Sequence, residues 1–157
     1  MIQVTKRDGH KEPLDIEKLH KVVFHACDDI TGVSPSEVEI KSQIQFFNGM
    51  KTSEIQETLI KAAADLITEE TPNYQYVGGR LINYALRKEV YNGYEACTVK
   101  ELVERNTEKG FYDPELITYY SDEEWDTINT FVKHERDESL TYVAMEQLRG
   151  KYLCQNR

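Results

Sequence analysis

The amino-acid sequence predicts a mainly α-helical protein with a small β-hairpin at its N-terminus. Two short segments of alternating apolar and polar residues flank an Asp-Gly turn within the first 14 residues. Apolar residues then recur at the 3.6-residue spacing of helices, between residues that cap helix starts and glycines that end helices. We therefore expect a hairpin and a four-helix cluster over residues 1–92, and further helices over residues 93–157.

The hairpin prediction rests on the residues around the turn. Ile2 and Val4 alternate with polar neighbours, and Asp8 with Gly9 tolerates the positive φ angles of a tight turn. Residues 11–14 return along the first strand. Pro13 has no N–H to donate, so the second strand is expected to be short or to lie at an edge.

The first two helices are predicted between residues 15 and 49. Asp15 is a favourable N-cap. The apolar stripe after it consists of Ile16, Leu19, Val22, Val23, Ala26, Cys27 and Ile30. Ser34 and Glu37 have the spacing of a capping box for the second helix, which Asn48-Gly49 ends. The apolar residues expected to continue this helix are Ile40, Ile44 and Phe47.

Two longer helices follow. Thr52 or Ser53 is expected to cap the third helix, and Thr71-Pro72 to open the fourth, which Asn92-Gly93 closes. Their inward residues are Ile55, Leu59, Ala62, Ala63, Leu66 and Ile67 in the third, and Val77, Leu81, Ala85 and Leu86 in the fourth. Gly78 and Gly79 each cost about 1 kcal/mol inside a helix. This cost predicts that another backbone approaches closely there.

The last third of the chain predicts shorter helices. Capping boxes begin at Thr98 and Ser121, Gly110 ends one helix, and Asp113-Pro114 begins another. An amphipathic stretch over residues 139–148 ends at Gly150, and residues 151–157 are expected to begin a strand. Apolar faces that would need a partner lie around Trp125, Phe131, Tyr142 and Leu148.

Composition excludes several classes of function. The formal net charge of −9 and a pI near 5.0 disfavour nucleic-acid binding. No apolar run approaches the ~20 residues of a membrane span, and no signal peptide opens the chain. Cys27, Cys97 and Cys154 are odd in number and form no CxxC pair, which argues against a disulfide scaffold and a zinc site. We therefore expect a cytoplasmic protein.

Polar residues near the hairpin and the helix ends indicate an anion site. The set consists of Lys6, Arg7, Lys18, Thr52 and Lys88. Thr52 lies at a helix N-terminus, where free N–H groups and the helix dipole favour an anion. If the hairpin folds over the helix ends, the set surrounds a triphosphate, and Glu12 and Asp15 supply acceptors for an adenine amino group. The alternative is an ordinary solvated surface, since neither a Walker loop nor a G-x-G-x-x-G motif is present.

Enzymatic sites have less support in the sequence. The chain contains no nucleophile elbow and no HExxH motif. The charged run at residues 134–137 is typical of a solvated or interface helix end. His20 and His25 have no partner ligands at suitable spacing, so we interpret them as surface residues and assign neither a catalytic residue nor a metal site.

Several segments follow one another in the order and spacing of a known family. They are residues 4–9 with Glu12 and Lys18, and residues 51–56, 60–67, 73–77 and 86–88. This set resembles the ATP-cone domain of class Ia ribonucleotide reductase large subunits. Residues 110–113, 133–137 and 150–153 resemble the helical segment after the cone. The resemblance implies an ATP-cone, a hairpin lid over a four-helix bundle, at residues 1–92 and the start of the helical domain at residues 93–157.

The resemblance also implies a function. In this family the cone is the overall-activity switch of ribonucleoside-diphosphate reductase, which makes deoxyribonucleotides for DNA synthesis; ATP permits activity, and in many members dATP stops it. By position, the five residues of the anion set hold phosphates or ribose, and Glu12 and Asp15 face adenine. The other implied nucleotide contacts are Leu14 and, secondarily, Val4, Leu19, Gln56 and Tyr84. The expected ligand is ATP, or dATP, with Mg²⁺.

Two residues depart from the pattern of dATP-inhibited members, which carry histidines where this chain has Gln56 and Ala85. Large subunits of tailed bacteriophages share this feature, and some of them escape inhibition. The resemblance therefore implies a cone that binds adenine nucleotides but responds weakly to dATP, in the cytoplasm of a host cell if a phage encodes it.

The family's catalytic cysteines and barrel have no counterpart among these residues. We expect the chain alone to be inactive, and to be a truncated or split part of a large subunit. Its expected partners are the remainder of that subunit, from the same gene or a second polypeptide, and the diiron small (beta) subunit.

Two other functions stay open. One is a stand-alone nucleotide-responsive regulator such as a repressor with a zinc ribbon, against which the missing cysteine pairs and the acidic charge speak. The other is a helical interaction module without a ligand. Stabilisation by ATP distinguishes a nucleotide-binding protein from this last alternative. A ligand at 100 times its dissociation constant adds roughly 2.7 kcal/mol to the free energy of unfolding.

Overall fold

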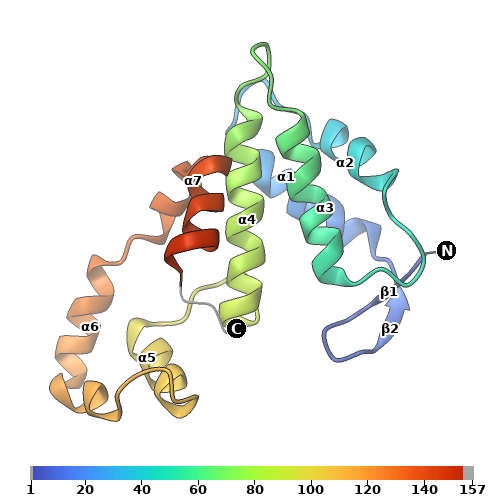
Figure 1. Ribbon diagram of the computed structural model, residues 1–157. Coiled ribbons are helices and arrows are strands. Elements are labelled where there is room, and N and C mark those ends of the chain that lie inside the picture. The colour runs from blue at the N-terminus through green and yellow to red at the C-terminus, as the bar shows by residue number, and fades with distance from the viewer. Residues whose placement is uncertain (1, 154–157) are drawn as a thin grey trace. The chain divides into compact units, whose positions relative to one another are not determined.

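The computed structural model describes residues 2–153 and confirms the predicted fold class: helices, with one two-stranded antiparallel sheet (Figure 1). Packing divides the chain into two compact units. The first contains the described residues up to Leu86 together with those from Asp137 onward, and the second contains Arg87–Arg136. The sequence domains expected at residues 1–92 and 93–157 stay a prediction. Within residues 2–153, none of the helices combines the length and apolar character that a membrane crossing requires.

The predicted hairpin is confirmed. Strand β1 (Gln3–Thr5) pairs antiparallel with β2 (Lys11–Pro13), so that Val4 lies opposite Glu12. The turn contains Gly9 at a φ of +85°, and the backbone N–H of Lys6 donates to the carbonyl of His10 at 2.8 Å. Pro13 is the last residue of β2, where its missing N–H removes no ladder bond from the middle of the strand.

The hairpin is attached to the chain that leads into the third helix. Thr5 N–H donates to the Met50 carbonyl at 2.9 Å, Gly49 N–H donates to the Gln3 carbonyl at 2.8 Å, and Lys51 forms a parallel bridge with Thr5. Strand β1 therefore uses both of its edges, one for β2 and one for this segment. These bonds fix the hairpin beside the start of that helix.

Four helices and the hairpin share the core of the first unit: α1 (Ile16–Cys27), α2 (Pro35–Gln43), α3 (Thr52–Asp65) and α4 (Tyr74–Tyr91). The predicted stripes of α1, α3 and α4 supply most of the buried residues, among them Leu19, Val23, Ala26, Ile55, Leu59, Ala62, Ala63, Val77 and Leu81. The prediction that Ile16 belongs to the apolar stripe of α1 is wrong, because this residue lies in the first turn and is 63% exposed.

The predicted length of the second helix is wrong. Helix α2 ends at Gln43, and the apolar residues expected on its inner face are largely exposed: Ile40, Ile44 and Phe47. Residues after Gln43 turn so that the chain can run beside β1, where the Asn48 side-chain carbonyl accepts from Gln3 N–H at 2.9 Å. The turn at Gly49, with a φ of +89°, belongs to this strand-like approach.

The predicted capping box at Ser34 and Glu37 does not form. The Ser34 side chain makes no cap bond, and the Glu37 carboxylate instead accepts a hydrogen bond from the Tyr74 hydroxyl. Tyr74 is fully buried at the start of α4, and its hydroxyl oxygen also accepts from Ser34 N–H at 2.9 Å. The need to satisfy this buried hydroxyl explains why Glu37 points away from its own helix.

The start of α4 also differs from the prediction. The helix begins at Tyr74 rather than at Thr71-Pro72, because the Thr71 hydroxyl donates back to the Leu66 carbonyl at 2.7 Å and completes a turn. The predicted end is confirmed, since Asn92 has a left-handed φ of +59°.

A segment from the end of the chain completes the first unit. Helix α7 (Tyr142–Gln147) and the π-helical turn η3 (Leu148–Tyr152) return to α4, beside which α7 lies in Figure 1. A Cβ on Gly79 would lie 2.0 Å from the Leu140 carbonyl oxygen, and one on Gly78 would lie 3.1 Å from the Tyr142 Cβ. The close backbone approach predicted from the two glycines is therefore confirmed.

The predicted strand after Gly150 is wrong for the residues that the structure describes. Gly150 and Lys151 lie inside η3, which extends to Tyr152. Residues 154–157, the rest of that prediction, lie outside the described residues.

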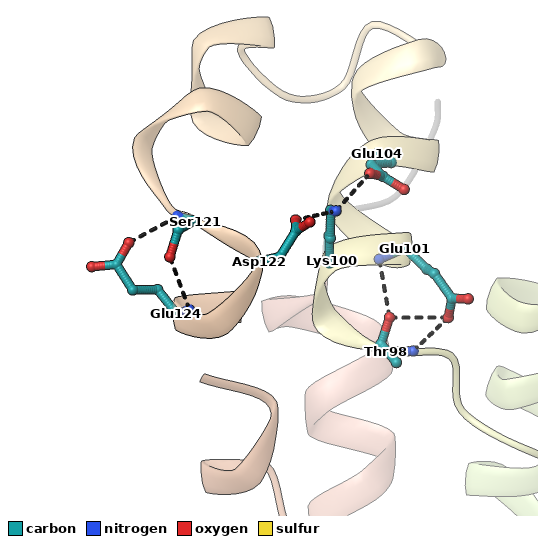
Figure 2. A network of polar contacts seen from close by, with 7 residues as sticks. All are labelled: Thr98, Lys100, Glu101, Glu104, Ser121, Asp122 and Glu124. Carbon is teal, nitrogen blue, oxygen red and sulfur yellow. Dashed lines mark hydrogen bonds and ion pairs between the residues drawn. The ribbon is translucent and has the colours of Figure 1, made fainter. Parts of the chain in front are cut away.

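The second unit contains α5 (Val99–Glu108), the 3₁₀ helix η1 (Pro114–Tyr119) and α6 (Asp122–Phe131). Another 3₁₀ helix, η2 (His134–Ser139), follows it across the boundary. Both predicted capping boxes form: Thr98 with Glu101 and Ser121 with Glu124 (Figure 2). Trp125, expected on an unpartnered face, is buried instead, whereas Phe131 is 77% exposed.

Candidate functional site

The hairpin brings the first two predicted site residues together. Lys6 follows β1 and Glu12 lies in β2, and the Lys6 Nζ lies 3.0 Å from the Glu12 Oε1. Both side chains remain more than one-third exposed. The pair forms a hydrogen-bonding surface of both signs: an ammonium that can face a phosphate and a carboxylate that can accept from an amino group.

Asp15 and Lys18 form a second pair at the start of α1. The Asp15 Oδ1 accepts from the Lys18 backbone N–H at 3.0 Å, and its Oδ2 lies 3.4 Å from the Lys18 Nζ. The Lys18 backbone hydrogen bond is the main cause that lowers the pKa of Asp15, so this carboxyl stays ionised. Helix α1 therefore carries its own anion at its N-terminus, which makes that terminus a poor place for a phosphate.

Helix α3 begins differently from the prediction. Lys51 is its N-cap, and Thr52, predicted as the cap, is its first helical residue. The bridge to Thr5 holds Lys51 in an extended conformation, so the helix begins at Thr52 itself, one residue earlier than a cap at Thr52 predicted. Glu54 accepts from Lys51 N–H at 2.7 Å. Sequence reasoning missed Lys51, because its position as the N-cap depends on the bridge to Thr5 in a separate segment.

A cation at this end of α3 is unfavourable without an anion nearby. The N-terminus of a helix carries a partial positive charge, and a basic residue there destabilises the helix by roughly 0.3–1 kcal/mol. The Lys51 backbone lies beside Thr5, the residue before Lys6. The start of α3 thus has a basic N-cap residue beside the Glu54 carboxylate, whereas the N-cap of α1 is itself an acidic residue.

The remaining first-unit residues of the predicted set differ in exposure. Val4 and Leu19 are buried core residues, and Leu14 packs against the same core with its N–H donating to the Ile2 carbonyl. Gln56, one turn after Thr52, and Tyr84 in α4 are partly buried. The apolar members of the predicted set therefore belong to the core of the first unit or pack against it.

The other two predicted phosphate contacts are Arg7 and Lys88. Arg7 is exposed in the turn that follows β1. Lys88 belongs to the second unit, where its Nζ lies 4.6 Å from the centre of the Tyr94 ring, within the range of a cation–π contact. The structure thus brings together Lys6 with Glu12 and Asp15 with Lys18, and it describes Lys88 within its own unit.

The other reactive side chains have ordinary structural settings. The His20 Nδ1 lies 2.6 Å from the Glu39 Oε1 and joins α1 to α2. Burial raises the pKa of the Cys27 thiol to about 11, which keeps it protonated. Cys97 is partly exposed, and Cys154 lies outside the described residues. Over residues 2–153, no group of three or more His, Cys, Asp or Glu side chains is arranged to hold a metal ion.

Comparison with known proteins relates this site to a family. Residues 2–89 match the ATP cone domain. The chain is 46% identical to ribonucleoside-diphosphate reductase 1 subunit alpha of Escherichia coli, over 98% of the chain and 20% of that protein. It is 44% identical to the alpha subunit of Haemophilus influenzae, over 99% of the chain and 21% of that protein. The alpha subunit of Enterobacteria phage T4 is 40% identical, over 100% of the chain and 21% of that protein.

These matches cover nearly the whole chain but only part of each relative. The chain spans about a fifth of the length of the curated relatives it matches. The similarity extends beyond residue 89, where the match to the ATP cone domain ends. Residues of both compact units therefore belong to the stretch that matches these relatives.

Proposed function

The chain belongs to the ATP cone domain family, and from that premise we propose that it is the allosteric overall-activity region of a ribonucleoside-diphosphate reductase alpha subunit. Its ligand is ATP, with dATP as a competing ligand. The nucleotide binds where the hairpin meets the starts of α1 and α3. The chain acts in the cytoplasm, that of a host cell if a phage encodes it.

One observation carries this proposal: strand β1 is hydrogen-bonded to the segment that leads into α3. Through Thr5 and Lys51, this contact sets the Lys6–Glu12 pair near a helix N-terminus whose N-cap side chain makes no cap hydrogen bond. A triphosphate needs cations and free N–H groups, and an adenine needs a hydrogen-bond acceptor. This junction offers all three within one hairpin and one helix start.

The two helix starts receive different parts of the nucleotide. Asp15 already occupies the start of α1 with an ionised carboxylate, so phosphates are repelled there and an adenine amino group is attracted. The start of α3 has Thr52 and Lys51, and it takes the phosphates together with Lys6. Arg7, Lys18 and Lys88 add charge around the polyphosphate. Leu14, Val4, Leu19, Gln56 and Tyr84 complete the contacts.

Mg²⁺ accompanies the nucleotide. A magnesium ion retains several water ligands and is bound mainly through phosphate oxygens when a protein supplies few carboxylates. The pairs at this junction are carboxylates with lysines, which suit a hydrated ion held by the phosphates rather than a dedicated protein cage. The ion therefore enters and leaves with the nucleotide.

Catalysis belongs to another part of the subunit. The three cysteines of this chain include one buried thiol with a raised pKa, and we propose that none of them reduces substrate. The chain alone is inactive and acts on the remainder of the alpha subunit, from the same gene or a second polypeptide. That assembly works with a diiron beta subunit.

Weak inhibition by dATP is part of the proposal. Gln56 lies one turn after Thr52 on α3, and Ala85 lies beside Tyr84 on α4. Neither side chain carries the positive charge that a protonated imidazole would place near phosphates or ribose. ATP and dATP therefore bind with similar affinity, and calorimetric titration with each nucleotide measures the difference.

Binding of ATP to the 157-residue chain tests the proposal. ATP with Mg²⁺ is expected to raise the melting temperature, while GTP, which lacks the adenine amino group, raises it less. Lys6→Ala is expected to weaken ATP binding about tenfold, in line with one charged hydrogen bond. The matched control is Lys11→Ala, an exposed lysine in β2 that is expected to bind ATP normally.

Absence of any thermal shift at millimolar ATP would contradict the proposal and favour a helical module without a ligand. Equal losses for Lys6→Ala and Lys11→Ala would show that binding depends on overall charge rather than on the hairpin junction.

A further inference from the structure

Arg149 joins helix α3 to the π-helical turn η3 near the C-terminus. Arg149 in η3 donates from Nη1 to the Glu57 Oε1 at 2.7 Å and from Nη2 to the Glu57 Oε2 at 3.1 Å. Its Nη2 also lies 2.6 Å from the Glu146 Oε1. We call these three residues the Arg149 clamp.

The clamp is built more firmly than an ordinary surface pair. The Arg149 side chain is 24% exposed, and its bond to Glu57 is bidentate, the arrangement in which guanidinium and carboxylate match best. The hydrogen bonds that the guanidinium donates to Glu57 are the first cause that raises its pKa further above the usual range. Its two partners differ in position: Glu57 lies on α3, whereas Glu146 lies three residues away on α7.

Helix α3 connects the clamp to the proposed phosphate position. Glu57 follows Thr52 by five residues, which is about 7.5 Å along a helix axis. The helix is continuous over this distance, so a displacement or fraying of its first turn reaches Glu57. The clamp therefore lies within reach of changes at the start of α3.

Arg149, at the other end of the clamp, lies in a π-helical turn, which is an uncommon backbone conformation. Residues Leu148–Tyr152 form a π-helical turn, with Leu153 N–H donating to the Leu148 carbonyl at 2.9 Å. Such turns are rare and often lie at functional positions. The preceding residues are held firmly, because Gly79 admits the Leu140 backbone and Met145 is buried in the core. The π turn is therefore the part of the returning segment that can change while the rest stays in place.

We propose that the Arg149 clamp transmits nucleotide occupancy from the start of α3 to the π turn η3. This inference rests on the proposed function of the hairpin junction. Phosphates bound at the start of α3 order its first turn, which holds Glu57 in position for the bidentate contact. Arg149 then holds the π turn. Without nucleotide the first turn of α3 is held less firmly, the contact between Glu57 and Arg149 weakens, and the backbone amides of η3 exchange more freely.

Hydrogen exchange of the 157-residue chain, with and without ATP and Mg²⁺, tests the inference. In the unmodified chain ATP is expected to slow exchange both in residues 3–18 and 51–56 and in residues 148–153. In Glu57→Gln the first two segments are still protected, but residues 148–153 lose the effect of ATP. The matched control is Glu146→Gln, which removes the other carboxylate of the clamp and leaves the contact with α3.

Affinity gives a second readout, because coupling between two positions is reciprocal. Glu57→Gln is expected to weaken ATP binding about two- to fivefold, the range that one surface ion pair allows, while Glu146→Gln binds as the unmodified chain does. Far-ultraviolet circular dichroism of both variants checks that the helices are intact.

The outcomes separate the inference from the proposed function. If ATP protects the hairpin and α3 but never residues 148–153, the inference fails and the nucleotide site stands. Protection of residues 148–153 that persists in Glu57→Gln also overturns it. If ATP protects no segment, the proposed function itself fails.

Discussion

The two compact units are stabilised in different ways. The first unit has a continuous apolar core that includes fully buried Tyr74, Ile82 and Val77 and extends from Val4 in the hairpin to Met145 in α7. Within residues 87–136, all of which the structure describes, the buried residues are Val103 and Trp125. The second unit depends instead on local polar contacts at its helix starts, as Figure 2 shows.

The polar contacts of the second unit are exposed, and two of them join residues only three positions apart. Thr98 and Ser121 each accept from the residue three positions later, and Lys100 joins α5 to Asp122 of α6 at 2.7 Å. An N-cap hydrogen bond contributes about 1 kcal/mol, and an exposed ion pair contributes little because solvent screens it. The difference teaches that the first unit has the structural basis to hold a ligand site, while the second has little core of its own.

Exposed aromatic residues reinforce this contrast. Phe111, Tyr119 and Phe131 are 53%, 62% and 77% exposed in the second unit. Apolar surface of this kind usually marks a contact with another part of a protein. We therefore propose that these three aromatic side chains contact the remainder of the alpha subunit, the partner proposed above for the chain.

The largest expected effect comes from the close contact in the first unit. Gly79→Ala places a Cβ 2.0 Å from the Leu140 carbonyl oxygen, so the returning segment must move away from α4. We expect a loss of about 3 kcal/mol in the free energy of unfolding, measured by chemical denaturation with circular dichroism. Gly93→Ala is the control, because nothing lies within 4 Å of its added Cβ, and it is expected to change stability by about 0.5 kcal/mol at most. Equal stabilities of the two variants would contradict the packing of α7 on α4.

The next largest effect is expected from removing one tyrosine hydroxyl in each unit. Tyr74→Phe removes a fully buried hydroxyl that contacts Ser34 and Glu37, and it is expected to destabilise the first unit by about 1–3 kcal/mol. Tyr119→Phe removes a hydroxyl that donates to Glu115 at 3.2 Å on a residue that is 62% exposed, and it is expected to cost about 0.5 kcal/mol or less. Thermal melts of both variants measure the difference, and a larger loss for Tyr119→Phe would reverse the comparison.

Capping residues are expected to matter more in the second unit. Thr98→Ala removes a hydroxyl that accepts from Glu101 N–H, at a cost of about 1 kcal/mol. Ser34→Ala is the counterpart in the first unit, where the serine side chain makes no cap bond, and it is expected to have little effect. Trp125 is the only tryptophan of the chain and lies in the second unit, so its fluorescence follows that unit alone. Equal fluorescence midpoints for Thr98→Ala and the unmodified chain would refute the role of the cap.

The smallest expected effect is a pH dependence of the second unit. Hydrogen bonds from the Thr98 backbone and hydroxyl lower the pKa of Glu101. A carboxyl whose pKa is lower in the folded state stabilises the fold above its unfolded pKa, about 4.3 for glutamate, and this contribution is lost as the pH falls through the folded value. The unfolding midpoint of the second unit, followed by Trp125 fluorescence, is therefore expected to fall on acidification. The fall is expected to be less steep in Glu101→Gln. Identical acid profiles for the two chains would exclude this contribution.

Local features of the fold were predictable from the sequence because nearby residues determine them. The Asp8-Gly9 turn predicted the pairing that places Lys6 beside Glu12, and the boxes at Thr98 and Ser121 formed as expected. Gly79 predicted a close backbone contact, but its partner is Leu140, which lies 61 positions later (140 minus 79). No local pattern identifies a partner at that distance.

The errors arise where a distant contact overrides a local preference. Helix α2 ends early because the following residues pair with β1, and Glu37 leaves its capping position because Tyr74 is buried beside it. The contact between Lys6 and Glu12 was predictable because both residues belong to the hairpin. Lys51 as the cap of α3 and the Arg149 clamp were not, since both depend on contacts between separate segments.

Amide NMR of the isotope-labelled 18.3 kDa chain, titrated with ATP and Mg²⁺, tests the central claim most directly. If the hairpin junction binds the nucleotide, the resonances of residues 3–6, 12–18 and 51–56 shift in a saturable way. The resonances of α5 and α6 in the second unit stay in place. Saturable shifts confined to residues 99–131, or an unchanged spectrum at millimolar ATP, would contradict the account.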